Sequence, residues 1–251
     1  MSDYLYGINP VREALHEGQR KPLELLLISG EQNTRLEQLV ADAGRLNLPV
    51  RYLTRRDLER LSGQVHHQGV LLKLAPFTYA DFTAVLDDWQ SSWEPGFFLL
   101  LDGITDPHNF GAILRSAEIA GCRAAVVAKD RSCPVTPVVE KTAAGALSYL
   151  PLCRVTNLSR AIEELKQRGV WCYGLAGEEG AGDLFQTDLS GHLALVVGSE
   201  GAGLRSNIRK HCDQLLSIPM RGRIGSLNAS VAAGIALFEV VRQQNESIST
   251  S

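Results

Sequence analysis

The sequence predicts an α/β protein made of two units, the second of them built around a parallel sheet. Strand-like and helix-like patterns alternate over residues 1–75 and again over 96–251. The strand-like runs of the second part, such as FFLLLD at 97–102, are apolar throughout, as is typical of parallel strands covered on both faces. Residues 76–95 interrupt the alternation with four acidic residues and no basic one, and they are predicted to form a linker.

The first unit, residues 1–75, is expected to be a compact α/β module. One helix opens at Pro10 and closes near Gly18, because proline suits the first turn and glycine the end of a helix. A later helix begins after Thr54, a residue type that caps helix N-termini. The predicted strands are 23–28, 50–53 and 69–74, the middle helix is 34–46, and one short helix is expected at 80–89 within the linker.

The second unit, residues 96–251, is expected to alternate five strands with five helices. Its last residues, 243–251, are polar and small, and they are predicted to be a disordered tail. The predicted strands are 97–102, 124–128, 170–175, 193–198 and 214–218, and the predicted helices are 110–120, 137–146, 158–168, 204–211 and 227–242.

Composition excludes several classes of protein. No stretch of 18 apolar residues is present, and the first ten residues lack the basic-then-apolar layout of a signal peptide, so a cytoplasmic protein without a membrane partner is expected. The five cysteines are scattered without a C-x-x-C pair. This spacing argues against a disulfide framework and a zinc site, and it predicts reduced, buried thiols and no metal.

The net charge of −3 conceals a local basic bias. The acidic excess lies in residues 76–95, whereas residues 205–223 hold five lysines and arginines against one acid, Asp213. Such a bias favours an anionic partner, although a solvated basic face would have the same composition.

Polar, glycine-bearing loops follow three of the predicted strands, where ligands bind in open parallel sheets. The loops contain neither a G-x-G-x-x-G pattern nor a G-K-[ST] pattern, so they match neither a Rossmann fingerprint nor a P-loop. A purely structural alternative is that Asn109 caps a helix and Arg115 pairs with Glu118. Together the loops supply the candidate catalytic residues Asn109, Arg115, Glu200, Ser226 and Asn228.

Three segments, NFGAILR (109–115), GSEGAGL (198–204) and SIPMRGRIGSLNASVAAGIALFE (217–239), resemble the motifs of the SpoU (TrmH-type) 2′-O-ribose RNA methyltransferases of the SPOUT superfamily. YLYGINPVREAL and HHQGVLLKL are similar to parts of the ribosomal-protein-like RNA-binding domain that some members carry. LDGITDPHN and RVTNLSRA extend the similarity toward bacterial members that methylate a guanosine of 23S ribosomal RNA. The resemblance thus covers nearly the whole chain.

The resemblance implies a deep trefoil knot, in which the last segment threads through a preceding loop. It also implies that S-adenosylmethionine is the methyl donor and lies in the knot. By the same resemblance, backbone groups of Gly198, Ile218 and Leu227 would hold the cofactor, with Met220 nearby. The expected partners are large-subunit ribosomal RNA and a second copy of the chain, but not DNA.

Arg115 is the expected essential residue of the reaction, and two roles are open for it. The resemblance implies that it is the base, yet a guanidinium has a pKa above about 12 and holds its proton. Alternatively, Arg115 binds phosphate and stabilises the developing alkoxide. Two other functions also stay open: a transfer RNA ribose methyltransferase, and an RNA-binding or ribosome-assembly factor without catalysis.

Overall fold

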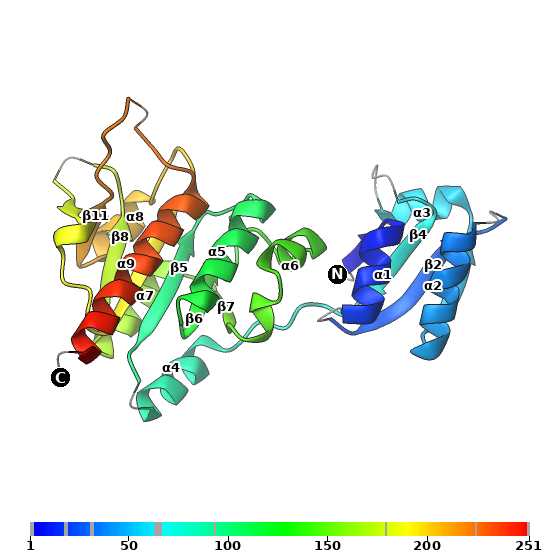
Figure 1. Ribbon diagram of the computed structural model, residues 1–251, viewed down its shortest axis with the longest axis horizontal. Helices are drawn as coiled ribbons and strands as arrows, with labels where there is room; N and C mark the ends of the chain where they lie inside the picture. Colours follow the sequence, from blue (N-terminus) through cyan, green and yellow to red (C-terminus); the bar gives the residue numbers. More distant parts are fainter. Residues whose placement is uncertain are drawn as a thin grey trace. The chain divides into compact units, whose positions relative to one another are not determined.

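Two compact units make up the chain, Met1–Thr78 and Tyr79–Ser251 (Figure 1). The computed structural model describes residues 3–17, 20–30, 33–62, 67–92, 94–178, 180–223 and 225–249. Most of the predicted linker, 76–95, belongs to the second unit in this structure. The reason is α4 (Phe82–Ser91), whose Phe82, Leu86 and Trp89 recur at helical spacing and are buried in that unit's core.

The first unit is a four-stranded mixed sheet in the order β1-β4-β2-β3. β2 and β3 run parallel, whereas β4 is antiparallel to both β1 and β2. Leu25, Leu39, Leu58 and Leu72 lie in a core of its own. The elements are β1 (Asp3–Tyr6), α1 (Ile8–Glu17), β2 (Pro22–Ile28), α2 (Thr34–Arg45), β3 (Val50–Leu53), α3 (Arg55–Ser62) and β4 (Val70–Leu74). Gly18, the predicted end of the first helix, lies outside the described residues.

The second unit contains a seven-stranded sheet in the order β7-β6-β5-β10-β8-β11-β9. Every pairing in it is parallel, which confirms the predicted fold class. The strands are β5 (Phe97–Asp102), β6 (Ala124–Ala128), β7 (Leu152–Val155), β8 (Trp171–Leu175), β9 (Gly182–Asp183), β10 (Leu193–Gly198) and β11 (Gln214–Ser217). Besides α4, the helices are α5 (Pro107–Ile119), α6 (Pro137–Ala143), η1 (Ala146–Ser148), α7 (Leu158–Gln167), η2 (Leu184–Gln186), α8 (Ser206–His211) and α9 (Ala229–Ser249).

Helices cover both faces of this sheet. Phe98 and Leu100 of β5 belong to a buried cluster that includes residues of α4, α7 and α8. Their neighbours Leu99 and Leu101 are equally buried, and they point to the opposite face because side chains alternate along a strand. On that face α5 and α9 pack together, as Figure 1 shows in green and red.

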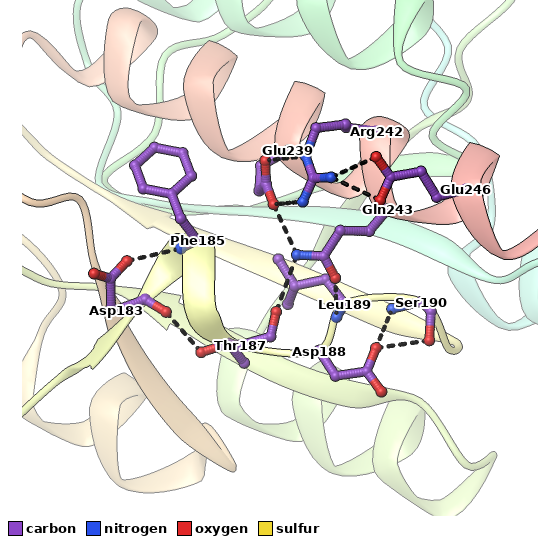
Figure 2. A network of polar contacts seen from close by, with 10 residues as sticks. All are labelled: Asp183, Phe185, Thr187, Asp188, Leu189, Ser190, Glu239, Arg242, Gln243 and Glu246. Carbon is purple, nitrogen blue, oxygen red and sulfur yellow. Dashed lines mark hydrogen bonds and ion pairs between the residues drawn. The ribbon is translucent and has the colours of Figure 1, made fainter.

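The predicted disordered tail, 243–251, is helical up to Ser249, and Thr250 and Ser251 lie outside the described residues. Figure 2 shows the polar contacts that hold this end of α9. Gln243 donates from Nε2 to the carbonyl of Thr187 (3.0 Å) and accepts at Oε1 from the Leu189 N–H (2.8 Å). The composition of the tail could not reveal these contacts, because their partners lie more than 50 residues away.

The five cysteines are free thiols, and four of them are buried. Burial raises the pKa of Cys153 and of Cys172 to about 12, so both thiols stay protonated at neutral pH. None of the described helices is long and apolar enough to cross a membrane.

Candidate active site

Asn109 lies in the first turn of α5, next to the carboxyl end of β5. Asp106 caps the helix, because its side chain accepts a hydrogen bond from the Asn109 backbone N–H (2.7 Å). Pro107 occupies an opening position of the helix, where no backbone N–H is required. The local sequence D-P-H-N (106–109) therefore fixes the backbone position of Asn109 at the start of α5.

Glu200 is presented by a tight glycine loop after β10. Ser199 and Gly203 form an isolated bridge, with the Gly203 N–H donating to the Ser199 carbonyl (2.9 Å). Gly203 has a φ of 62°, and a Cβ on Gly198 would lie only 2.2 Å from the Gly203 backbone. Only glycine permits this close approach, which leaves Glu200 exposed at the tip of the loop.

Asn228 caps the N-terminus of α9. Its Oδ1 accepts hydrogen bonds from the Ser230 N–H (2.9 Å) and the Ser230 hydroxyl (2.6 Å). The side-chain NH₂ is thereby left for other partners, and it donates to Asn109 Oδ1 (2.9 Å) and to Glu200 Oε1. The S-L-N-x-S pattern therefore both starts the last helix and ties it to α5.

The Asn109, Glu200 and Asn228 side chains form one hydrogen-bonded cluster, which we call the amide–carboxylate cluster. Asn109 Nδ2 donates to Glu200 Oε1 (3.1 Å), and the Ala229 N–H donates to the same oxygen (3.3 Å). The cluster joins three loops that are 28 to 119 residues apart in sequence. The structure thus brings together three of the five predicted catalytic residues.

Arg115 and Ser226 are not part of this cluster. Both are exposed, and within the described chain neither side chain makes a hydrogen bond or an ion pair. Arg115 does not pair with Glu118, so the structural alternative for this residue is not realised. Arg115 follows Asn109 by six residues, a rise of about 9 Å along the helix.

The predicted cofactor-binding residues lie on the loops after β10 and β11 and at the start of α9. Gly198 is buried at the end of β10, Ile218 and Leu227 are half-buried, and Met220 is 43% exposed. A Cβ on Gly177, in the loop after β8, would lie 4.0 Å from the Gly225 carbonyl oxygen. Loops after β8, β10 and β11 therefore meet at one edge, as the predicted knot requires; the threading itself stays a prediction.

Asp102 and Arg205 hold the glycine loop from its other end; the sequence placed neither in the site and marked Arg205 only within the basic bias of residues 205–223. The side chain of Asp102, the last residue of β5, is fully buried. It accepts hydrogen bonds from the Arg205 N–H (2.8 Å) and from Arg205 Nε (2.6 Å). The available signal was an acid at the end of an otherwise apolar strand. A buried carboxylate of this kind needs a hydrogen-bonding or oppositely charged partner.

A parallel α/β domain whose loops converge on a polar cluster beyond the strands has the arrangement of a ligand-binding domain. The model of the SpoU rRNA methylase family matches residues 96–238, and the chain belongs to this family. A second model, RNA 2′-O ribose methyltransferase substrate binding, matches residues 4–80.

Relatives of this chain span nearly its whole length. It is 42% identical to a 23S rRNA (guanosine-2′-O-)-methyltransferase RlmB of Pasteurella multocida, over 97% of this chain and 99% of that protein. A protein of the same name from Vibrio vulnificus is 40% identical over 97% and 98%. Among solved structures, the SpoU methyltransferase AviRb from Streptomyces viridochromogenes, in complex with the cofactor AdoMet, is similar with a TM-score of 0.68. The two share 26% sequence identity over 98% of this chain and 91% of AviRb.

Proposed function

We propose that this protein transfers a methyl group from S-adenosylmethionine to the ribose 2′-hydroxyl of a guanosine in 23S ribosomal RNA. The family membership and the names of its full-length relatives support the reaction and the substrate. The observation in the structure that carries the proposal is the amide–carboxylate cluster, which joins three motif loops at the carboxyl edge of the sheet.

The reaction requires an oxygen nucleophile held in place and relieved of its proton. A bond forms between the ribose O2′ and the methyl carbon, the bond from that carbon to sulfur breaks to leave a neutral thioether, and the O2′ proton passes to water. When bound, S-adenosylmethionine supplies the electrophilic methyl group. The protein's task is therefore to position the hydroxyl and to stabilise the negative charge that develops on it.

The loops at this edge suit the adenine of S-adenosylmethionine. Gly198 lets the Gly203 backbone pack against the end of β10 and so shapes the loop, while Ile218 and Leu227 offer partly buried apolar side chains. Exposed backbone groups of such loops hydrogen-bond an adenine without any charged residue. We assign cofactor binding to Gly198, Ile218, Met220 and Leu227 on this basis.

Arg115 is assigned to the substrate because it carries a full charge and has no partner within the described chain. A guanidinium binds a phosphate through two parallel hydrogen bonds and keeps its proton at neutral pH. Arg115 would hold the phosphate beside the target ribose and stabilise the alkoxide. Asn109 and Glu200 would orient the ribose, while Ser226 and Asn228 would hold the loop and the substrate.

The first unit is assigned to RNA selection. It has its own hydrophobic core, and the substrate-binding family model matches it. A fragment starting at Tyr79 should keep its affinity for S-adenosylmethionine within about twofold, while methylation of ribosomal RNA falls below detection. Loss of cofactor binding in a folded fragment would contradict this division.

A homodimer is also proposed. α5 and α9 pack together and expose the apolar side chains of Ile119, Val231 and Phe238, which are 60%, 49% and 47% exposed. Covering these side chains with a second copy would remove them from water. Sedimentation at micromolar concentration should give twice the 27.4 kDa chain mass, and a monomer would contradict the proposal.

The activity is tested by incubating the protein with S-adenosylmethionine carrying a labelled methyl group and either 23S ribosomal RNA or transfer RNA. Label should enter 23S RNA at a guanosine 2′-O position. Label in transfer RNA alone would support the alternative substrate, and cofactor binding without any transfer would support an inactive RNA-binding factor.

A further inference from the structure

A polar cavity of about 420 Å³ lies at the carboxyl ends of β6 and β7, between the loops that follow them and the start of α8. We infer that it binds one nucleotide of the substrate RNA other than the nucleotide that is methylated. This inference rests on the proposed function and adds a second RNA contact to the catalytic unit. Its volume is within the range of small-ligand sites, about 300–1,000 Å³.

Three separate segments form the walls of this cavity. Ala128 ends β6, Thr156 and Asn157 follow β7, and Arg205 and Asn207 belong to the start of α8. The cavity therefore opens at the carboxyl edge of the parallel sheet, where such sheets bind ligands. Asn157 lies in the RVTNLSRA segment, which the assignment of the methyl-transfer site leaves without a role.

The hydrogen-bonding groups of the cavity are held in place by the fold. Ser159 is 5% exposed, and its hydroxyl accepts a hydrogen bond from Asn207 Nδ2 (2.7 Å). Asn157 Oδ1 accepts from the Ser159 N–H (2.9 Å), and within the described chain its NH₂ group makes no hydrogen bond. The guanidinium of Arg205 is fixed on the buried carboxylate of Asp102. Fixed donors bind a ligand with little loss of side-chain entropy.

Arg131 gives the cavity its free positive charge. It is exposed and makes no hydrogen bond or ion pair within the described chain, and its φ of 59° is unusual for a residue with a side chain. Asp130 is the one acid among the lining residues, while the charge of Asp102 is met by Arg205. A guanidinium suits a phosphate, and the neutral amides and hydroxyls suit a base edge or a 2′-hydroxyl. This combination favours a nucleotide over a simple anion.

The glycine loop connects the cavity to the methyl-transfer site. Glu200 lies in the amide–carboxylate cluster, and Arg205, five residues later, lines the cavity. Five residues span at most about 18 Å, so a nucleotide in the cavity lies near the target ribose. One RNA strand can therefore occupy both places.

The inference is tested by RNA affinity over a series of salt concentrations, using the full chain and a 23S ribosomal RNA fragment. Arg131→Gln should raise the Kd for RNA about tenfold and lower the slope of log Kd against log salt by about one. The Kd for S-adenosylmethionine and the methyl-transfer rate at saturating RNA should stay within twofold of wild type. Asn207→Asp, which keeps the side-chain shape but adds a negative charge, should weaken RNA binding at least as much.

Arg123→Gln is the control in the same unit, because Arg123 directly precedes β6 at the opposite edge of the sheet and its charge is paired with Glu94. It should leave the RNA affinity and the salt slope unchanged. Wild-type values for both Arg131→Gln and Asn207→Asp would overturn the inference, as would an equal loss in Arg123→Gln. A wild-type protein that binds this RNA but transfers no methyl group would contradict the proposed function alone, since the binding comparison remains valid.

Discussion

The candidate active site contains two groups of residues that differ in how the fold treats them. Asn109, Glu200 and Asn228 bind one another through hydrogen bonds, whereas Arg115 and Ser226 make none within the described chain. The hydrogen bonds of the first group are formed without a ligand, whereas the polar atoms of the second group are available to bind one. The difference indicates a division of work: the amide–carboxylate cluster positions the loops, and Arg115 engages the RNA.

Replacement of Arg115 should have the largest effect on catalysis. Arg115→Lys keeps the charge but loses the planar fork that binds phosphate, so single-turnover methyl transfer at saturating RNA should fall about a hundredfold or more. The affinity for S-adenosylmethionine should change less than twofold. Near wild-type turnover in Arg115→Ala would show that Arg115 takes no part in the reaction.

The pH dependence of Arg115→Lys distinguishes the two roles of this residue. Lysine has a reference pKa near 10.4, so a lysine that acts as the base should recover activity as the pH rises toward about 10. A residue that only positions phosphate and stabilises the alkoxide should show no recovery. We expect no recovery between pH 7 and 10.

A double-mutant cycle tests the division between the two groups directly. Glu200→Ala and Asn228→Ala should be coupled by about 1 kcal/mol in the free energy of unfolding, because each removes a hydrogen bond that the other also removes. Glu200→Ala and Arg115→Ala should be additive within about 0.5 kcal/mol. Strong coupling of Arg115 to Glu200 would show that Arg115 belongs to the cluster.

Two substitutions of Asn228 distinguish its role as a helix cap from its role in positioning the loops. Asn228→Ala removes the cap of α9 and should lower the free energy of unfolding by about 1 kcal/mol. Asn228→Asp keeps the capping oxygen but replaces the donor to Glu200 with a like charge. It should therefore retain the helix yet lose cofactor affinity, measured by calorimetry. Equal cofactor affinity in wild type and Asn228→Asp would show that Asn228 acts only as a helix cap.

The smallest effect is expected far from the site, in the network of Figure 2. Hydrogen bonding from Arg242 holds the pKa of Glu239 below its ordinary value of 4.5. The ionised carboxylate therefore stabilises the folded state above pH 4.5, and this stabilisation is lost as the pH falls through the lowered pKa. Arg242→Ala should be less stable than wild type at pH 7, and the difference should vanish in acid. A difference that does not shrink as the pH falls below 4.5 would contradict this.

Much of the fold was predictable because its signals are local. Apolar strands such as 97–102 and 193–198 fall where β5 and β10 lie, and their continuous burial is what a parallel sheet requires. The strands β1, β7 and β9 were missed, because no strong apolar run marks them and pairing with neighbouring strands specifies them. The linker and tail predictions were based on polar composition. α4 instead buries one apolar face, and Gln243 binds a distant backbone.

The candidate site was predictable in its residues but only partly in its geometry. The polar loops after the strands supplied Asn109, Glu200 and Asn228, and the resemblance supported them, yet the hydrogen bonds among them depend on three loops meeting in space. The acid at the end of an apolar strand marked Asp102, but its pairing with Arg205 could not be predicted because it spans 103 residues. Their importance becomes visible only through burial.

The central claim is that this protein methylates the ribose of a guanosine in 23S ribosomal RNA. It is tested most directly by mapping 2′-O-methylation in RNA from a strain that lacks the gene, complemented with wild type or with Arg115→Ala. We expect one 23S guanosine to lose its methyl group in the deletion strain and to regain it with wild type but not with Arg115→Ala. An unchanged 23S profile together with a methyl group lost from transfer RNA would contradict the account.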